Sequence, residues 1–295
     1  MLASIISNYL VSNGSITSDQ QIQLMDELGK VRVKMGLIAV AEGMMTKEQA
    51  DQVNNLQAIQ DKRFGDIAVE KGFLTEGQVQ TLLKLQGNPF LSFVQALENL
   101  KLMDLDNLNE HLANYAKENH FSSSAIEDLK SDDVDRVLPL FIPADAAEYM
   151  DYACVALKTI MRCVDSQVYP SMATLTTNLT VNKAALQEVD GTMPITLGFA
   201  GCDDDLLSIA SIFGKEDFDS VDMDALDACA ELSNCINGLY ASALSQKGIS
   251  MELLAPEFSD DINALSSDEM LVIPITVAGS TSFLVLGIDS KIKMI

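Results

Sequence analysis

The chain has 295 residues, of which 48% are hydrophobic, and its formal net charge is −24. This apolar content excludes a disordered chain, and the length suits two domains. The negative charge, which is denser after residue 120, disfavours nucleic acid, anionic membranes and small anionic substrates, whereas a docked protein partner is compatible with it.

No segment predicts export or insertion into a membrane. The first residues, MLASIISNYLVSNG, lack the basic start of a signal peptide. The most apolar late run, MLVIPITVAGSTSFLVLGI, is interrupted by Pro274 and by polar residues after Gly279, so it predicts two strands joined by a turn. The cysteines form no CxxC pair and have no metal-ligand spacing, which predicts buried, reduced thiols. We therefore expect a soluble, cytoplasmic protein without a metal site.

The first third of the chain contains a repeat with a period of 29 residues. Residues 35–57, MGLIAVAEGMMTKEQADQVNNLQ, align without gaps on residues 64–86, FGDIAVEKGFLTEGQVQTLLKLQ, and a partial copy starts at Gly14. Each copy has a glycine that suits the left-handed end of a helix, then a threonine and a glutamine spaced for a capping box. Residues 1–120 are therefore predicted to form stacked helix–turn–helix units, with a degenerate fourth unit capped by Asp104.

The segment RFGDIAVEKGFLTEGQVQTLLKLQ resembles the N-terminal domain of type II secretion and pilus ATPases, including the version that binds cyclic di-GMP. That family has two 24-residue motifs five residues apart, which match Lys34–Gln57 and Arg63–Gln86. Lys34 stands where the family has arginine, and arginine stacks on guanine and forks to phosphate better than lysine does. The residues that the resemblance implies for this ligand are Lys34, Gly36, Gly43, Gln57, Arg63, Gly65, Gly72 and Gln86.

Other interpretations of the repeats stay open. They are a fold relative that binds no nucleotide, a protein-docking module, and a structural part of a secretion or pilus apparatus. In each of these the glycines and the helix caps only shape turns.

Residues 121–142 predict a linker, because FSSSAIEDLKSDDVDR is rich in serine and aspartate and poor in apolar residues. The order of elements over 143–295 predicts an α+β fold in which an antiparallel sheet is backed by long helices. The predicted elements are a helix over 145–164, strands over 171–181 and 192–201, a helix over 203–214, a helix over 223–248, and strands over 248–258, 270–279 and 280–288, the last two forming a hairpin through Gly279 and Ser280.

Polar residues follow one face of the long helix predicted over 223–248. Asp227, Glu231 and Asn234 fall at i, i+4 and i+7, which places them on one face over two turns. Such a row is ordinarily a solvated helix face. Asn237 and Gly238 are poor helix formers, and the small Gly238 would allow another element to pack closely.

The region 143–295 resembles the CheX/CheC family of chemotaxis phosphatases. The signature of this family is Asp or Ser, three residues, Glu, two residues, Asn, and then Pro after roughly 22 residues. Here it reads Asp227, Glu231, Asn234 and, after 21 residues, Pro256. A single copy implies the CheX-type branch, which dimerises. The resemblance implies that the protein removes phosphate from a phosphorylated CheY-like response regulator in chemotaxis or two-component signalling.

The resemblance also implies a role for each residue of the row. Asn234 would orient the water that attacks the partner's aspartyl phosphate, and Glu231 would pair with the partner's active-site lysine. Asp227 either joins the site or supports the start of the helix. An amide suits the positioning of water because it accepts and donates hydrogen bonds without changing its protonation.

No cofactor is expected on this chain, because the magnesium ion belongs to the response regulator in this mechanism. The alternative function is a non-catalytic adaptor that docks a receiver domain or dimerises, with the N-terminal repeats as a module that binds a partner or cyclic di-GMP.

Overall fold

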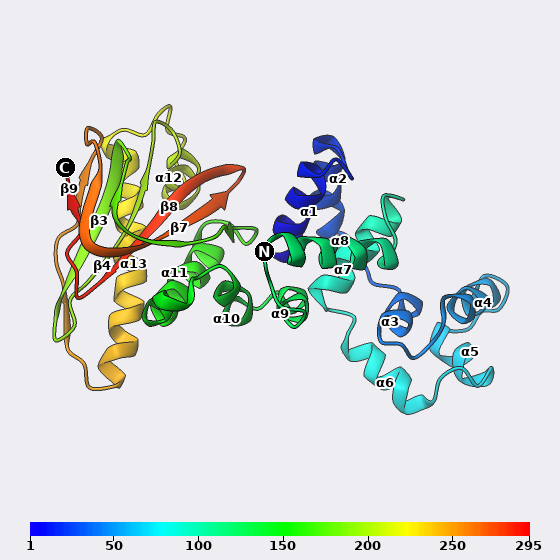
Figure 1. Ribbon diagram of the computed structural model, residues 1–295. Helices are drawn as coiled ribbons and strands as arrows, with labels where there is room; N and C mark the ends of the chain where they lie inside the picture. Colours follow the sequence, from blue (N-terminus) through cyan, green and yellow to red (C-terminus); the bar gives the residue numbers. More distant parts are fainter. The chain divides into compact units, whose positions relative to one another are not determined.

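The computed structural model describes residues 1–295, and the chain divides into two compact units, Leu2–Asp132 and Asp133–Ile295 (Figure 1). The boundary lies within the predicted linker, residues 121–142, and short helices occupy much of this stretch. Asp132 ends the first unit in a left-handed conformation with a φ of 53°, and its Oδ1 accepts a hydrogen bond from the backbone N–H of Leu2 at 2.7 Å. The two ends of the first unit are therefore joined.

The first unit is all helical, as predicted, and α7 lies at its apolar centre. Helix α7 buries Phe93, Val94 and Leu97 and contacts α1, α2 and α3. The helices of this unit are α1 (Leu2–Ser12), α2 (Ser18–Leu28), α3 (Met35–Ala41), α4 (Lys47–Gln57), α5 (Phe64–Glu70), α6 (Glu76–Lys84), α7 (Pro89–Asn99), α8 (Leu105–Glu118) and α9 (Ala125–Ser131).

The cap chemistry predicted for the repeats is confirmed. Capping boxes begin α2, α4 and α6, and in each the threonine hydroxyl accepts the N–H of the glutamine three residues later at 3.2 Å. The fourth unit begins at Asp104, which caps α8 by accepting from the N–H of Asn107. Lys101, which stands where the repeat has glycine, takes the same left-handed conformation with a φ of 56°.

The second unit has the predicted α+β architecture. The predicted helices and strands occur in the predicted order, with β3 added between two of them, and every strand pairing in the sheet is antiparallel. Its elements are α10 (Val134–Val137), the 3₁₀ turns η1 (Leu138–Leu140) and η2 (Ala144–Tyr149), α11 (Met150–Cys163), β1 (Tyr169–Pro170), β2 (Thr174–Leu179), β3 (Lys183–Gly191), β4 (Ile195–Gly201), α12 (Leu207–Gly214), α13 (Met223–Gln246), β5 (Met251–Leu253), β6 (Glu257–Ser259), β7 (Leu265–Val277), β8 (Ser280–Ile288) and β9 (Lys293–Met294).

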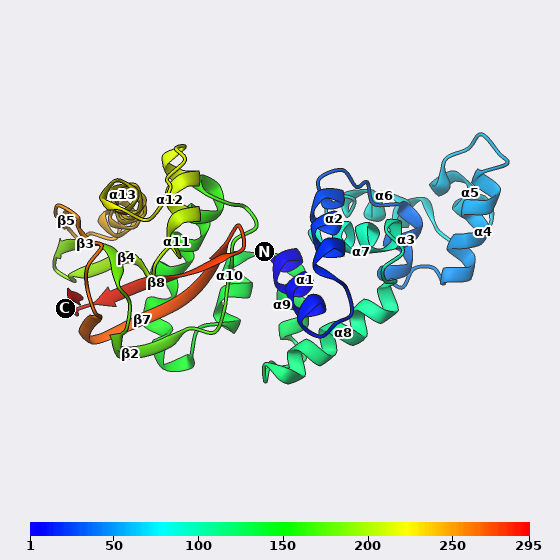
Figure 2. The same ribbon diagram turned by 90° about the horizontal axis from the view of Figure 1, so that it is seen from above.

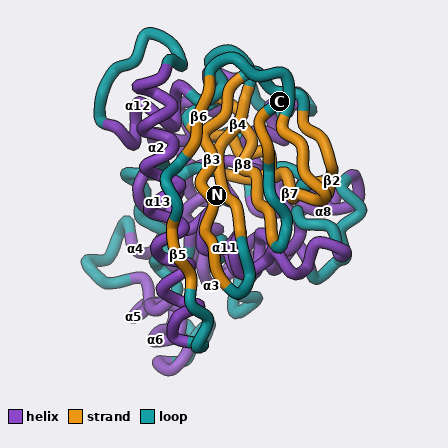
Figure 3. The backbone as a smooth tube through the Cα atoms, turned by 90° about the vertical axis from the view of Figure 1, so that its left-hand side faces the viewer, coloured by secondary structure: helices purple, strands orange, loops and turns teal.

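The sheet runs in the order β1-β7-β8-β4-β3-β5, with β6 also beside β3 and with β2 and β9 beside β7. Figure 3 displays the long strands side by side. Helix α13 contacts β3 and β4 as well as α11 and α12, and Figure 2 shows these three helices gathered on one face of the strands. The centre of the sheet therefore has α13 across it.

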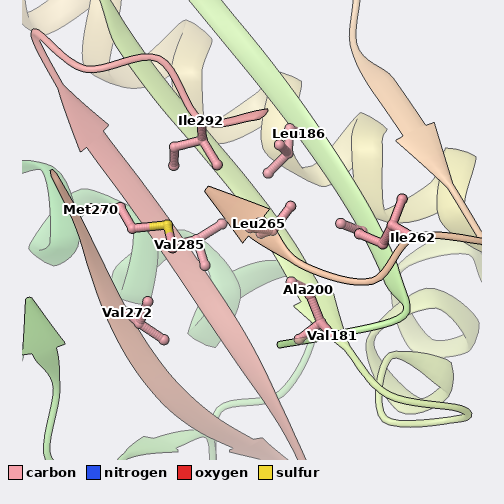
Figure 4. Packing of buried hydrophobic residues seen from close by; sticks show 10 residues of the cluster. Val181, Leu186, Ala200, Ile262, Leu265, Met270, Val272, Val285 and Ile292 are labelled. Atoms are coloured by element: carbon pink, nitrogen blue, oxygen red, sulfur yellow. The ribbon is translucent and has the colours of Figure 1, made fainter. Parts of the chain in front are cut away.

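The opposite face of the sheet has its own apolar cluster. Successive residues of a strand point to opposite faces, so Gln187 of β3 points to α13 while its neighbour Leu186 points away. Leu186 packs there with residues of β4, β7 and β8 and with the segments around Ile262 and Ile292, which cover this face (Figure 4). Both faces of β3 are thus buried.

Several boundaries differ from the sequence predictions. The strand β3 was not predicted. Helix α12 begins at Leu207, and the three preceding aspartates lie in turns that end β4 instead of in the helix. The turn of the β7–β8 hairpin consists of Ala278 and Gly279, which both have positive φ, and Ser280 already belongs to β8.

The expectation of five buried thiols is wrong for three of them. Cys154 and Cys229 are buried, whereas the other three lie on polar helix faces or in a turn where they are exposed. All five cysteines are free thiols. Every helix of the chain falls short of the length or hydrophobicity that a membrane-spanning helix needs.

Candidate functional site

The three residues of the polar row lie on α13, and all three side chains are exposed. The opposite side of this helix is apolar and buried, and it includes Cys229 and Ile236. Because α13 is fixed along the sheet by this face, Asp227, Glu231 and Asn234 are presented to solvent on a rigid element. The structure thus brings Glu231 and Asn234 together on one face, one turn apart.

The start of α13 does not depend on Asp227. The cap is Asp222, whose Oδ1 accepts from the N–H groups of Asp224 and Ala225 at 3.1 and 3.0 Å. Asp227 lies in the second turn, beyond the four N–H groups that a cap can satisfy. Asp227 therefore does not cap α13, and its role in the site stays a prediction.

The carboxamide of Asn234 is held by a residue that the sequence did not single out. The Nε2 of Gln187, on β3, donates to Asn234 Oδ1 at 2.9 Å and to the backbone oxygen of Leu254 at 3.0 Å. Gln187 is only 2% exposed. A buried amide thus anchors the exposed one, whose Nδ2 makes no hydrogen bond within the chain.

The anchor itself belongs to a buried polar chain. Asn237 is fully buried, and its Nδ2 donates to Gln187 Oε1 at 2.9 Å. Its Oδ1 accepts from the hydroxyl of Tyr152 on α11. Burial raises the pKa of Tyr152 well above its usual value, so the hydroxyl stays a neutral donor, and its ring stacks on Tyr240 at 4.4 Å between centroids. The weak helix former Asn237 is therefore part of a satisfied polar network.

Gln187 was not predicted as a site residue because its strand, β3, was not predicted. The segment KAALQEV has no alternation of polar and apolar residues, since both faces of β3 are covered. The one feature of the sequence that could have indicated Gln187 is its position as a polar residue inside a short apolar run. The proline of the signature lies close in sequence to this contact, because Leu254, whose carbonyl Gln187 binds, precedes Pro256 by two residues.

No other element of this chain packs closely against Gly238, although its small size would permit such packing. No atom lies within 4 Å of the position that a Cβ would occupy there. The surface one turn beyond Asn234 is therefore open, with Leu239 beside it at 43% exposure.

The residues implied for cyclic di-GMP do not line one common cavity of the first unit. Lys34 and Gly36 line a cavity of about 420 Å³, and Gly65 lines a second cavity of about 450 Å³. The other five, Gly43, Gln57, Arg63, Gly72 and Gln86, line neither of these cavities.

The glycines among these eight have structural reasons of their own. Gly43 and Gly72 have φ values of +65° and +72° and end helices. A Cβ on Gly36 would lie 3.1 Å from the ring of Phe64, and one on Gly65 would lie 2.8 Å from a methyl of Val79, so both positions permit close helix packing.

No family model matches the chain, and no curated protein matches it. It is similar to several solved structures at 11–17% identity. A CheC-like superfamily protein from Shewanella sp. PV-4 is 17% identical, with 46% of this chain and 94% of that one covered at a TM-score of 0.41. The chemotaxis protein CheX from Desulfovibrio desulfuricans is 14% identical, with coverages of 48% and 97% and a TM-score of 0.40.

A third similar structure is a CheX–CheY–BeF₃–Mg²⁺ complex from Borrelia burgdorferi, at 14% identity, coverages of 49% and 97%, and a TM-score of 0.34. These three solved structures are CheC-like and CheX chemotaxis proteins, and each corresponds to about half of the length of this chain. The middle domain of FliM is also similar, at 14% identity, coverages of 46% and 88%, and a TM-score of 0.30.

Proposed function

We propose that the second unit removes the phosphoryl group from a phosphorylated, CheY-like response regulator. The observation that carries this proposal is the pair of exposed side chains on α13, Glu231 and Asn234, of which Asn234 is held by a buried hydrogen bond. A solvated helix face needs no such anchor. The match of this pair to the CheX/CheC signature gives the reaction class.

The chemistry asks little of this chain beyond positioning. The aspartyl phosphate of the receiver is attacked in line by water, and the charge on the phosphoryl oxygens is balanced by the magnesium ion of the receiver. Asn234 holds the attacking water and contacts a phosphoryl oxygen. Its amide stays neutral throughout, so that catalysis derives from geometry. Glu231 pairs with a lysine of the receiver and fixes the complex.

The test is phosphate release from acyl-phosphorylated receiver domains of the same genome, followed with wild-type chain, Asn234→Ala and Glu231→Ala. We expect Asn234→Ala to lower kcat about a hundredfold with little change in KM, since it removes positioning of the water. Glu231→Ala is expected to raise KM about tenfold, because an ion pair across the interface is lost.

The matched control is Asn178→Ala, which removes an exposed asparagine side chain from β2 at another part of the sheet and is expected to leave both constants unchanged. Equal decay of every receiver with and without the wild-type chain would contradict the phosphatase. Saturable binding of a receiver without faster decay would indicate the adaptor function instead. Sedimentation of the wild-type chain tests the dimer that the CheX-type resemblance implies.

For the first unit, binding of cyclic di-GMP stays a proposal with one observation in its favour, the cavity beside Lys34 and Gly36. Asp51, Glu98 and Asp104 line the same cavity and would repel phosphate. Calorimetric titration of the full chain decides between these influences. Saturable heat that Arg63→Ala abolishes would support the nucleotide site, whereas no heat at high micromolar ligand would leave a docking module or a scaffold.

A further inference from the structure

A single backbone carbonyl determines how the buried polar network is oriented. The two ends of an amide side chain have similar shapes, so their assignment follows from the partners. Gln187 is placed against the carbonyl oxygen of Leu254, which can only accept, so the Nε2 end of Gln187 faces Leu254. The same nitrogen faces Asn234, and the atom of Asn234 that receives this bond is therefore Oδ1.

The remaining partners agree with this orientation. With Nε2 toward Leu254, the Oε1 of Gln187 faces Asn237, which donates its Nδ2 to it. The Oδ1 of Asn237 is then left for Tyr152, whose hydroxyl donates. Reversing any one amide would oppose two donors or two acceptors, which leaves polar groups without partners and is unfavourable.

We propose that Gln187 is a positioning residue that fixes the carboxamide of Asn234 with Oδ1 turned toward β3 and Nδ2 turned outward. The inference rests on the proposed function and extends it, because it states which atom of Asn234 meets the phosphoryl group. A phosphoryl oxygen is anionic and only accepts, so it requires the N–H donors of Asn234 at that point.

The attacking water is accommodated by the same orientation. A carbonyl oxygen has two lone pairs, and Gln187 occupies one of those on Asn234 Oδ1. The second lone pair can accept from the water while the outward N–H groups donate to a phosphoryl oxygen. If the carboxamide of Asn234 were rotated by 180°, its oxygen would face the phosphoryl oxygens and its nitrogen would face the Nε2 of Gln187, so both contacts would be repulsive.

The experiment compares Gln187→Glu and Gln187→Met with Thr159→Val in the full chain. Glutamate has the shape of glutamine but carries one proton at most, so it cannot donate to both Leu254 and Asn234, and methionine cannot donate at all. Both variants are expected to lower kcat tenfold to a hundredfold and to change KM less than threefold. Thr159→Val removes a buried hydroxyl of α11 that donates to the backbone oxygen of Val155 and lies outside the network, so kcat should stay within about twofold.

A second readout does not depend on turnover. The ¹H–¹⁵N side-chain signals of Asn234, assigned by their loss in Asn234→Ala, should exchange rapidly with water in the wild-type chain and slowly in Gln187→Glu, where Nδ2 turns inward. Slow exchange in the wild-type chain would overturn the proposal, as would wild-type kcat in both Gln187 variants or an equal loss in Thr159→Val. Rapid exchange in a wild-type chain that dephosphorylates no receiver would support this orientation of Asn234 and reject the proposed function alone.

Discussion

Polar residues in the middle of α13 differ in what surrounds them, and the sequence alone does not separate them. Glu231 and Asn234 are exposed, whereas Asn237, one turn later, is fully buried and bound to Tyr152 and Gln187. Asn237 has a low helix propensity, and its hydrogen bonds offset that disadvantage. At the scale of single residues, two poor helix formers of α13, Asn234 and Asn237, are thus the residues that bind Gln187, one in the candidate site and one in the buried network.

The cysteines give a prediction at the same scale. Burial raises the pKa of Cys229 to about 12, and burial together with nearby Asp135 raises that of Cys154 to about 12. Alkylation proceeds through the thiolate, so at pH 8 about one molecule in ten thousand is reactive at either position. We expect iodoacetamide to label only Cys163, Cys202 and Cys235 in the native chain, as measured by peptide mass spectrometry.

Unfolding in urea provides the control for this labelling, because all five thiols should then react at similar rates. Rapid native labelling of Cys229 at pH 8 would contradict the packing of α13 on the sheet.

At the scale of elements, the sequence predicts best what is local. The boundaries of the repeat helices follow from glycine, threonine and glutamine within a few residues of one another, and all three capping boxes were predictable for that reason. The strand β3 also depends on contacts with β5, β6 and α13, which are distant in sequence, and its Lys, Ala and Glu are weak strand formers.

The same distinction divides the candidate site. The spacing of Glu231 and Asn234 is visible within one helix, so that their shared face could be predicted. The bond between Gln187 and Asn234 joins residues 47 positions apart on a strand and a helix, and only the folded sheet brings them together. The pair Glu231 and Asn234 could therefore be predicted from the sequence, whereas Gln187, which anchors Asn234, could not.

Two glycines of the second repeat predict opposite effects on stability. Gly72 has a φ of +72° after α5, so that Gly72→Ala should lower the free energy of unfolding by about 1–2 kcal/mol. Gly77 lies inside α6, where a Cβ would meet nothing closer than 4.0 Å, and Gly77→Ala should raise it by about 0.5–1 kcal/mol. Urea unfolding followed by circular dichroism measures both.

Each variant is the control for the other, since both add one methyl group to an exposed position of the same repeat. A stabilising Gly72→Ala would mean that the turn after α5 does not require the left-handed conformation. The repeat would then lack the feature that its glycine spacing predicts.

At the scale of the whole molecule, the two units have separate cores. In the first, α2 and α3, which bury Leu24 and Ile38, both contact α7, which buries Leu97. In the second, the two faces of the sheet are covered by α13 and by the cluster around Leu186. The ends of the first unit are joined by the hydrogen bond between Leu2 and Asp132.

We therefore expect residues 2–132 and 133–295 to fold when produced as separate chains. Each should unfold cooperatively in urea, and the sum of their far-ultraviolet circular dichroism spectra should equal that of the full chain. The urea m-value of each should be smaller than expected for all 295 residues, because it scales with the surface exposed on unfolding. A fragment that stays unfolded while the full chain folds would show that its core depends on the other unit.

The fragments also separate the function of the site from that of the repeats. Glu231, Asn234 and the network that holds them lie entirely within residues 133–295, so this fragment should keep the kcat of the full chain to within about threefold. If the repeats dock the receiver or a protein bound to it, the fragment should have a raised KM with unchanged kcat, because only binding is lost. A lower kcat in a fully folded fragment would instead mean that the repeats contribute to the chemistry. That result would contradict a site that consists only of residues on α13 and β3.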